Sequence, residues 1–143
     1  MKRILVGVDG SKQERDVLGA ARNLAEKNGA QLILLRVVTI PIELPPRALA
    51  VSPDAVGPML SESAGKHVKE LAAELPPSLG ADARVALGSP WNAICDTARE
   101  ENVDLIVIGS HGYGGIDRLI GTTAAKVVNH ADCSVLVVRP ARG

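Results

Sequence analysis

Apolar runs rich in β-branched residues alternate with amphipathic stretches along the whole sequence, and this alternation limits the possible folds more than any other feature. Five runs are expected to form strands, namely residues 4–8, 32–38, 83–87, 105–109 and 135–138. All of them except 83–87 are nearly unbroken in apolar character, which is typical of strands buried on both faces. Strands that alternate with helices predict an α/β fold, in which helices cover a parallel sheet.

The stretches between these runs have the periodicity of helices. After the first run, Ser11 and Glu14 form a capping-box pattern, an apolar stripe extends from Val17 to Ala25, and Gly29 is expected to end the helix. Three further helices are expected from about Leu60 to Leu75 ahead of Pro76, from Ser89-Pro90 to Glu101, and from Gly121 or Thr122 to about His130.

Residues 41–58 break the pattern. They contain five prolines and no sustained period, so an irregular segment is expected after the second strand. In an open α/β sheet, ligands bind beyond the carboxyl ends of the strands, and this segment leaves from such an end. Two interpretations therefore remain, a segment that contributes to a ligand site and a solvated insertion.

Composition narrows the classes of function. With 143 residues, of which 46% are hydrophobic, the chain is expected to form one domain over residues 1–143. The 16 Lys and Arg balance the 16 Asp and Glu, which argues against a broad basic face for nucleic acid. The first apolar run stops at Asp9, too short for a signal peptide or a membrane span, so a cytoplasmic protein without a membrane partner is expected. Cys95 and Cys133 are expected to be small apolar core residues.

Several catalytic and metal-binding motifs are absent from the sequence. There is no GxxxxGK[ST] phosphate loop, no GxGxxG after a strand, no HExxH and no GxSxG. His67, His111 and His130 lack the spacing of metal ligands, so no metal site built from protein side chains is expected. No pair of residues has the pattern of a base and a transition-state stabiliser, so no catalytic residue is assigned.

The residues after the fourth expected strand have the features of a phosphate-binding site. Gly109 ends the strand, further glycines follow at 112, 114 and 115, and Gly121-Thr122-Thr123 opens a helix. Glycine permits close approach of the backbone, and a helix N-terminus offers unpaired N–H groups to an anion. The alternative is a tight connection between strand and helix that uses glycine for its geometry alone.

Five segments together resemble the universal stress protein family. They are ILVGVDGS at residues 4–11, LLRV at 34–37, GSP at 88–90, DLIVIGSHG at 104–112 and CSVLVV at 133–138. The resemblance extends over nearly the whole chain. It implies a doubly wound, five-stranded parallel sheet in the order 3-2-1-4-5 with helices on both faces, and a homodimer. In one branch of the family it also implies ATP bound where strands 1 and 4 diverge, the switch point of such a sheet.

The glycine pattern of the ATP-binding branch matches this chain in residue type. Eight residues separate Gly112 from Gly121-Thr122, where the family has nine. The resemblance implies that Asp9 lies near the ribose or a phosphate-bound Mg²⁺ and that Val37 offers its backbone to the adenine. A turn or cap role for Asp9, and a helix-cap role for the threonines, are equally open alternatives. The implied nucleotide-binding set comprises Gly7, Val8, Asp9, Val37, Ile108, Gly109, His111, Gly112, Gly121, Thr122 and Thr123.

The predicted function is that of a homodimeric, ATP-binding regulatory protein of the stress response, with Mg²⁺ as the accompanying ion. Two alternatives remain, a dimeric interaction module without nucleotide, which the eight-residue spacing favours, and a slow ATPase. The dimer is expected to form through an apolar edge strand without lysine, proline or bulge, because such an edge invites another strand. That strand comprises Val135, Leu136, Val137 and Val138. The alternative for this edge is cover by a terminal helix or by residues 41–58.

Overall fold

The structure, a computed structural model, describes residues 1–39, 53–110 and 120–140, without the side chains of residues 53–60. All five expected strands are present within one residue of their expected bounds. In chain order the elements are β1 (Arg3–Gly7), α1 (Glu14–Asn28), β2 (Gln31–Val38), α2 (Pro53–Ala73), a 3-10 turn (Pro77–Leu79), β3 (Asp82–Leu87), α3 (Pro90–Glu100), β4 (Leu105–Gly109), α4 (Thr122–His130) and β5 (Ser134–Val138).

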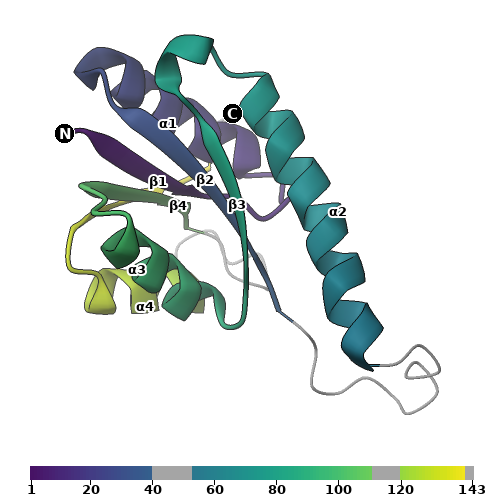
Figure 1. The fold of residues 1–143 in the computed structure, drawn as a ribbon. Helices are drawn as coiled ribbons and strands as arrows, with labels where there is room; N and C mark the ends of the chain where they lie inside the picture. The colour runs from purple at the N-terminus through teal and green to yellow at the C-terminus, as the bar shows by residue number, and fades with distance from the viewer. Residues whose placement is uncertain (40–52, 111–119, 141–143) are drawn as a thin grey trace.

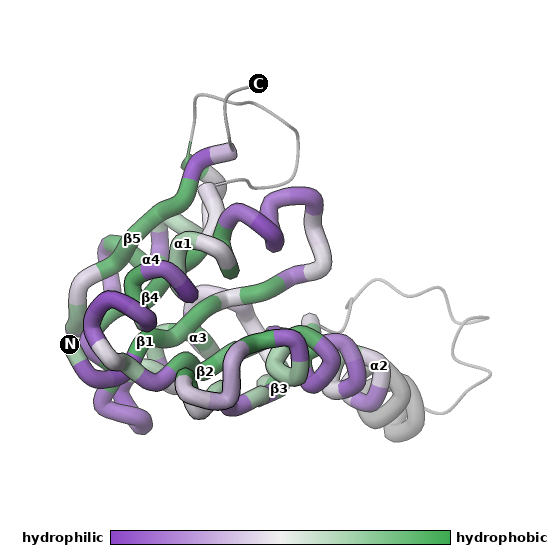
Figure 2. Tube along the Cα trace, turned by 90° about the horizontal axis from the view of Figure 1, so that it is seen from above, coloured by the Kyte–Doolittle hydropathy of each residue, from purple (hydrophilic) through white to green (hydrophobic). Residues whose placement is uncertain are grey.

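The five strands form one parallel sheet in the order β3-β2-β1-β4-β5, which confirms the expected doubly wound topology. Helices α1 and α2 cover one face of the sheet, and α3 and α4 cover the other (Figure 1). The strands are the most hydrophobic parts of the trace, whereas hydrophilic residues are concentrated on the helices and turns (Figure 2). Among the described residues, no helix is long and apolar enough to cross a membrane.

Each face of the sheet has its own hydrophobic core. Ile4 and Val6 of β1 belong to the core beneath α1 and α2, which also contains Val17. Leu5 lies between them in sequence and belongs to the opposite core, with Ile94 of α3. This separation follows from the strand period of two, because successive side chains of a covered strand enter different cores.

The first helix ends as expected but begins two residues after the capping box predicts. Gly29 is left-handed, with φ 63°, and its N–H donates to the carbonyl of Ala25. At the other end, Gln13 rather than Ser11 is the residue before the helix, and its conformation is already helical. The Ser11 hydroxyl still accepts the N–H of Gln13 at 3.3 Å, but the Glu14 carboxylate accepts the N–H of Gly10 instead of that of Ser11. The acidic side chain therefore fastens the turn that precedes the helix.

Helix α2 begins earlier than expected, and this corrects the interpretation of residues 41–58 as one irregular segment. Residues 53–58 are helical, while 40–52 lie outside the described residues. Pro53 suits the first position of a helix, because its φ is helical and an N–H there has no partner. Gly57 and Pro58 interrupt the apolar period by which a sequence signals a helix. The helix ends at Ala73, ahead of Pro76 as expected.

Candidate functional site

Strands β1 and β4 part at the carboxyl edge of the sheet. Their pairing ends at Val6 and Val107. Beyond that point, the N–H of Val8 donates to a carbonyl of β2 at 2.9 Å, whereas the N–H of Ser110 donates to a carbonyl of β5 at 2.9 Å. The segments that follow the two strands therefore pair with different neighbouring strands, β2 and β5. This is the switch point, where open α/β sheets bind their ligands.

Gly7 and Gly109 end the two diverging strands, and protein atoms crowd both of them. A Cβ on Gly7 would lie 3.1 Å from Cγ2 of Ile108. A Cβ on Gly109 would lie 3.3 Å from Cγ2 of Val17 and would overlap Oε1 of Gln13. Glycine at position 109 thus allows the first turn of α1 to pack against the end of β4, a role that does not depend on any phosphate.

Asp9 lies in a tight turn between β1 and α1. Its Oδ1 accepts the N–H of Ser11 at 2.9 Å, and Gly10 between them has φ 76°, a conformation that favours glycine. The turn role considered for Asp9 is therefore real. The side chain is exposed, and its second carboxylate oxygen has no hydrogen-bond partner among the described residues, so it is accessible to a ligand or an ion.

Helix α4 begins at the same edge of the sheet. The N–H of Gly121 is engaged, since it donates to the carbonyl of Ser110 at 2.8 Å. Gly121 is extended and precedes the helix, and no side chain caps this end in the described structure. The N–H groups of Thr122 and Thr123 have no partner within the helix, because they belong to its first turn, and none among the other described residues. These two groups are the donors that α4 offers to an anion.

Of the five remaining members of the predicted set, the structure describes three. Val8 and Ile108 are 3% and 4% exposed, so only their backbones are placed to contact a ligand. The side chain of Val37 packs against the core beneath α3 and α4, which leaves its backbone as the part that could contact an adenine. His111 and Gly112 lie outside the described residues. Among the residues that are described, no group of three or more His, Cys, Asp or Glu is arranged to hold a metal ion.

A chain of polar side chains next to this edge was not expected from the sequence. Nη1 of Arg36 lies 2.7 Å from Nδ1 of His67, and Nε2 of His67 lies 3.0 Å from Oε2 of Glu14. The chain links β2, α2 and α1. A signal for it exists in the sequence, because Arg36 interrupts the apolar run of a strand that is covered on both faces, and a charge in such a place needs a partner.

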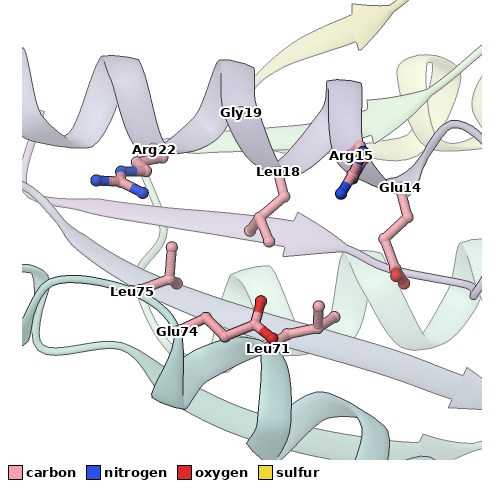
Figure 3. Close-up of a pocket in the computed structure, with 8 residues that line it drawn as sticks. All are labelled: Glu14, Arg15, Leu18, Gly19, Arg22, Leu71, Glu74 and Leu75. Atoms are coloured by element: carbon pink, nitrogen blue, oxygen red, sulfur yellow. The ribbon is translucent and has the colours of Figure 1, made fainter.

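A groove of about 370 Å³ runs between α1 and α2 (Figure 3). Its apolar part is formed by Leu18 of α1, Leu71 of α2 and Leu75, which follows α2. Arg15 and Glu74 are among the charged side chains around them. Both signs of charge are present, so the groove selects no ligand by charge.

The two cysteines are core residues, as expected. Cys95 is 3% exposed and belongs to the core beneath α3 and α4, and Cys133 packs against the same core. Burial raises the pKa of both thiols. A raised pKa reduces the fraction of thiolate, the nucleophilic form, so neither cysteine has the environment of a reactive one.

The doubly wound sheet, the divergence of β1 and β4 and the free donors of α4 define an open α/β protein of the Rossmann-like class. The Universal stress protein family matches residues 1–139. "Universal stress protein A homolog 2" of Coxiella burnetii is 34% identical over 143 residues, which cover 96% of this chain and 94% of that protein. The chain belongs to the universal stress protein family.

Solved structures agree with this assignment. The universal stress protein UspA from Lactobacillus plantarum has a TM-score of 0.74 and 29% identity, with 96% of this chain and 97% of that chain covered. A universal stress protein in complex with cAMP has a TM-score of 0.62 and 24% identity over 96% of both chains. One from Archaeoglobus fulgidus in complex with dAMP has a TM-score of 0.61 and 21% identity, over 97% of this chain and 98% of that one. At these lower identities the likeness establishes the fold alone.

Proposed function

We propose that this protein binds ATP where β1 and β4 diverge and acts as a regulatory protein through its nucleotide-bound state. The observation that carries the proposal is the pair of N–H groups of Thr122 and Thr123, which open α4 at the switch point. A helix N-terminus at such a place favours a phosphate, because its N–H groups donate and its dipole is positive there. The complexes of two fold relatives with cAMP and dAMP support a nucleotide of the adenine class.

Mg²⁺ fits this site only as an ion coordinated by the phosphates of the nucleotide. Among the described residues no cluster of carboxylates surrounds a cation position. Mg²⁺ binds through phosphate oxygens and waters with few protein ligands, so the exposed carboxylate of Asp9 is sufficient as a neighbour. When bound, the ion would offset the charge of the phosphates, while the α4 N–H groups orient them.

The same proposal includes a homodimer formed through β5. This strand lies at the edge of the sheet and pairs only with β4 among the described strands. Leu136 on β5 is 36% exposed and Val128 on α4 is 49% exposed. Val135 and Val137 face the core beneath α3 and α4, so Leu136 lies on the other face of the sheet, and each face has an exposed apolar side chain near this edge. A twofold partner would pair the two edges antiparallel, which covers both apolar surfaces and closes at two subunits.

Native mass spectrometry with and without MgATP tests ligand and assembly together. We expect a dimer that gains one nucleotide per subunit, and titration calorimetry should give the same stoichiometry. Because a ligand that binds only the folded state raises its apparent stability, the Tm should also rise. If millimolar MgATP gives neither bound nucleotide nor a change in Tm, the ATP-binding proposal is excluded and the interaction module remains as the alternative. A dimer in that case would support the interaction module. Release of phosphate on a time scale of minutes would favour the slow ATPase.

A further inference from the structure

Arg36 points into the space between α1 and α2, next to the proposed site. In β2, Leu32 and Leu34 belong to the core beneath these two helices. Arg36 follows them at the strand period of two and therefore lies on the same face. It also directly precedes Val37, whose backbone is in the proposed nucleotide-binding set.

The hydrogen bonds of His67 determine which ring nitrogen carries its proton. A guanidinium only donates, so Nδ1 of His67 must accept from Arg36 at 2.7 Å. Nε2 then carries the proton and donates to the carboxylate of Glu14 at 3.0 Å. In this state the imidazole is neutral and bridges a cation and an anion.

The chain ends on the turn that contains Asp9. The second oxygen of Glu14 accepts the N–H of Gly10 at 3.0 Å. Nη1 and Nη2 of Arg36 both lie 3.9 Å from the point where a Cβ on Gly10 would stand. His67 is thus connected to this turn through Glu14, and the guanidinium of Arg36 lies close to the same turn.

Among the described side chains, the charged groups in contact with His67 are Glu14 from α1 and Arg36 from β2. Strand β3, which also packs against α2, presents Ala83 and Val85 on this side, and both are apolar. The side chains of Glu14 and His67 are 16% and 25% exposed, so water screens their interaction only in part.

Protonation of His67 breaks only one of its two bonds, the one to Arg36. A proton on Nδ1 would face the Arg36 guanidinium, and two donors of like charge repel each other at hydrogen-bond distance. The bond to Glu14 is strengthened instead, because the imidazolium and the carboxylate attract. Arg36 therefore leaves His67 while α1, α2 and the turn stay connected.

We propose that Glu14, His67 and Arg36 form a proton-linked positioning cluster for the nucleotide site, in which a proton on His67 releases Arg36 toward the phosphates. The proposal rests on the proposed function. It requires affinity for MgATP to rise as pH falls, because a lower pH favours the charged imidazolium. By linkage, binding of MgATP then takes up protons at intermediate pH.

The tautomer of His67 is tested without any nucleotide. At pH 8, ¹⁵N NMR of the histidine rings should show His67 with its proton on Nε2 and a bare Nδ1. His130 is an internal control of the opposite kind, because its Nδ1 lies 2.7 Å from the carbonyl of Lys126 and must donate. The variant His67→Gln assigns the signal. A proton on Nδ1 of His67 at pH 8 would overturn the proposal.

Calorimetry with MgATP at about pH 8 and about pH 6 tests the coupling. Between about pH 8 and about pH 6, we expect the affinity of the wild type for MgATP to rise at least about fivefold more than that of His67→Gln. The comparison with His67→Gln also corrects for protonation of the nucleotide itself. Arg36→Gln should remove the same gain, and buffers of different ionisation enthalpy should reveal proton uptake in the wild type only. Circular dichroism and Tm establish that each variant is folded.

The outcomes separate this proposal from the proposed function. Binding with the same pH profile in the wild type and in folded His67→Gln overturns the cluster and leaves ATP binding intact. Failure of the wild type to bind MgATP at either pH overturns the proposed function, and the cluster's role in it falls as well.

Discussion

The N–H of Gly121 donates a 2.8 Å hydrogen bond to the carbonyl of Ser110. This bond joins the residue that follows β4 to the residue that precedes α4, so both ends of the connection between them are held together. The spacing between Gly112 and Gly121 is one residue shorter than in the family, and the Ser110–Gly121 bond forms with this spacing. Thr122 and Thr123 follow as the first donors of α4.

Thr122→Pro tests whether the N–H of Thr122 binds phosphate. Proline suits the first helical position, and Gly121 before it is extended, with φ −62° and ψ 163°, as the residue before a proline prefers. The helix should therefore keep its stability while one donor is lost. A hydrogen bond to a charged group contributes about 1.5–3 kcal/mol, so calorimetry should show affinity for MgATP at least about tenfold weaker.

Thr122→Ala is the matched control, because it removes the hydroxyl but keeps the N–H. Its affinity should stay within about threefold of the wild type, since a single exposed hydroxyl contributes little. Equal affinity in the proline variant and the wild type would place the phosphates elsewhere.

Gly109→Ala should destabilise the fold even without ligand. The new Cβ would press on Gln13 and Val17 in the first turn of α1, and overpacking of this kind costs about 1–3 kcal/mol. Gly19→Ala in the same helix is the contrast, because no atom lies within 4 Å of its Cβ position and alanine stabilises a helix interior by about 0.5–1 kcal/mol. Urea unfolding should show opposite signs for the two variants. A neutral Gly109→Ala would contradict the packing role assigned to this glycine.

Val137→Pro should convert the proposed dimer into a monomer. The carbonyl of Val138 accepts from Ser110 on the β4 side, and N–H and C=O of one residue point to the same side of a strand, so those of Val137 point to the free edge. Proline there removes a donor between subunits without breaking the pairing to β4. Light scattering should report half the mass, while Val137→Ala, which keeps the N–H, should remain dimeric. A wild-type monomer at micromolar concentration would refute the dimer.

Asp104→Asn should weaken the fold at neutral pH and flatten its response to acid. The Asp104 carboxylate accepts the N–H groups of Lys2 at 2.6 Å and Arg3 at 2.9 Å, and these bonds hold its pKa below the ordinary value. A lowered pKa contributes stability above the unfolded value of about 3.9, and this is lost as pH falls from there toward the folded value. Urea unfolding between about pH 7 and about pH 3 should therefore show a smaller pH dependence in the variant. Glu26→Gln, in an exposed pair with Arg22, should change little at any pH.

The strands were predictable because their signal is local. The run at residues 105–109 and strand β4 have identical bounds, since an unbroken apolar run between polar turns has few alternatives. The start of α2 was not predictable in the same way. Its first turns contain Gly57 and Pro58, whose local preferences oppose a helix. The helix forms there as part of a longer element that packs on β2 and β3.

The sequence by itself determined the class of fold and the glycine-rich passage between the fourth strand and the last helix. The family resemblance added the edge position of the last strand. Only the tertiary structure decided that Gly109 is a packing residue and that Arg36, His67 and Glu14 form one chain. Arg36 and His67 lie 31 positions apart in the sequence, and His67 and Glu14 lie 53 positions apart, which leaves 22 between Glu14 and Arg36. Contacts of that kind depend on where α1 and α2 settle on the sheet, which no local period in the sequence encodes.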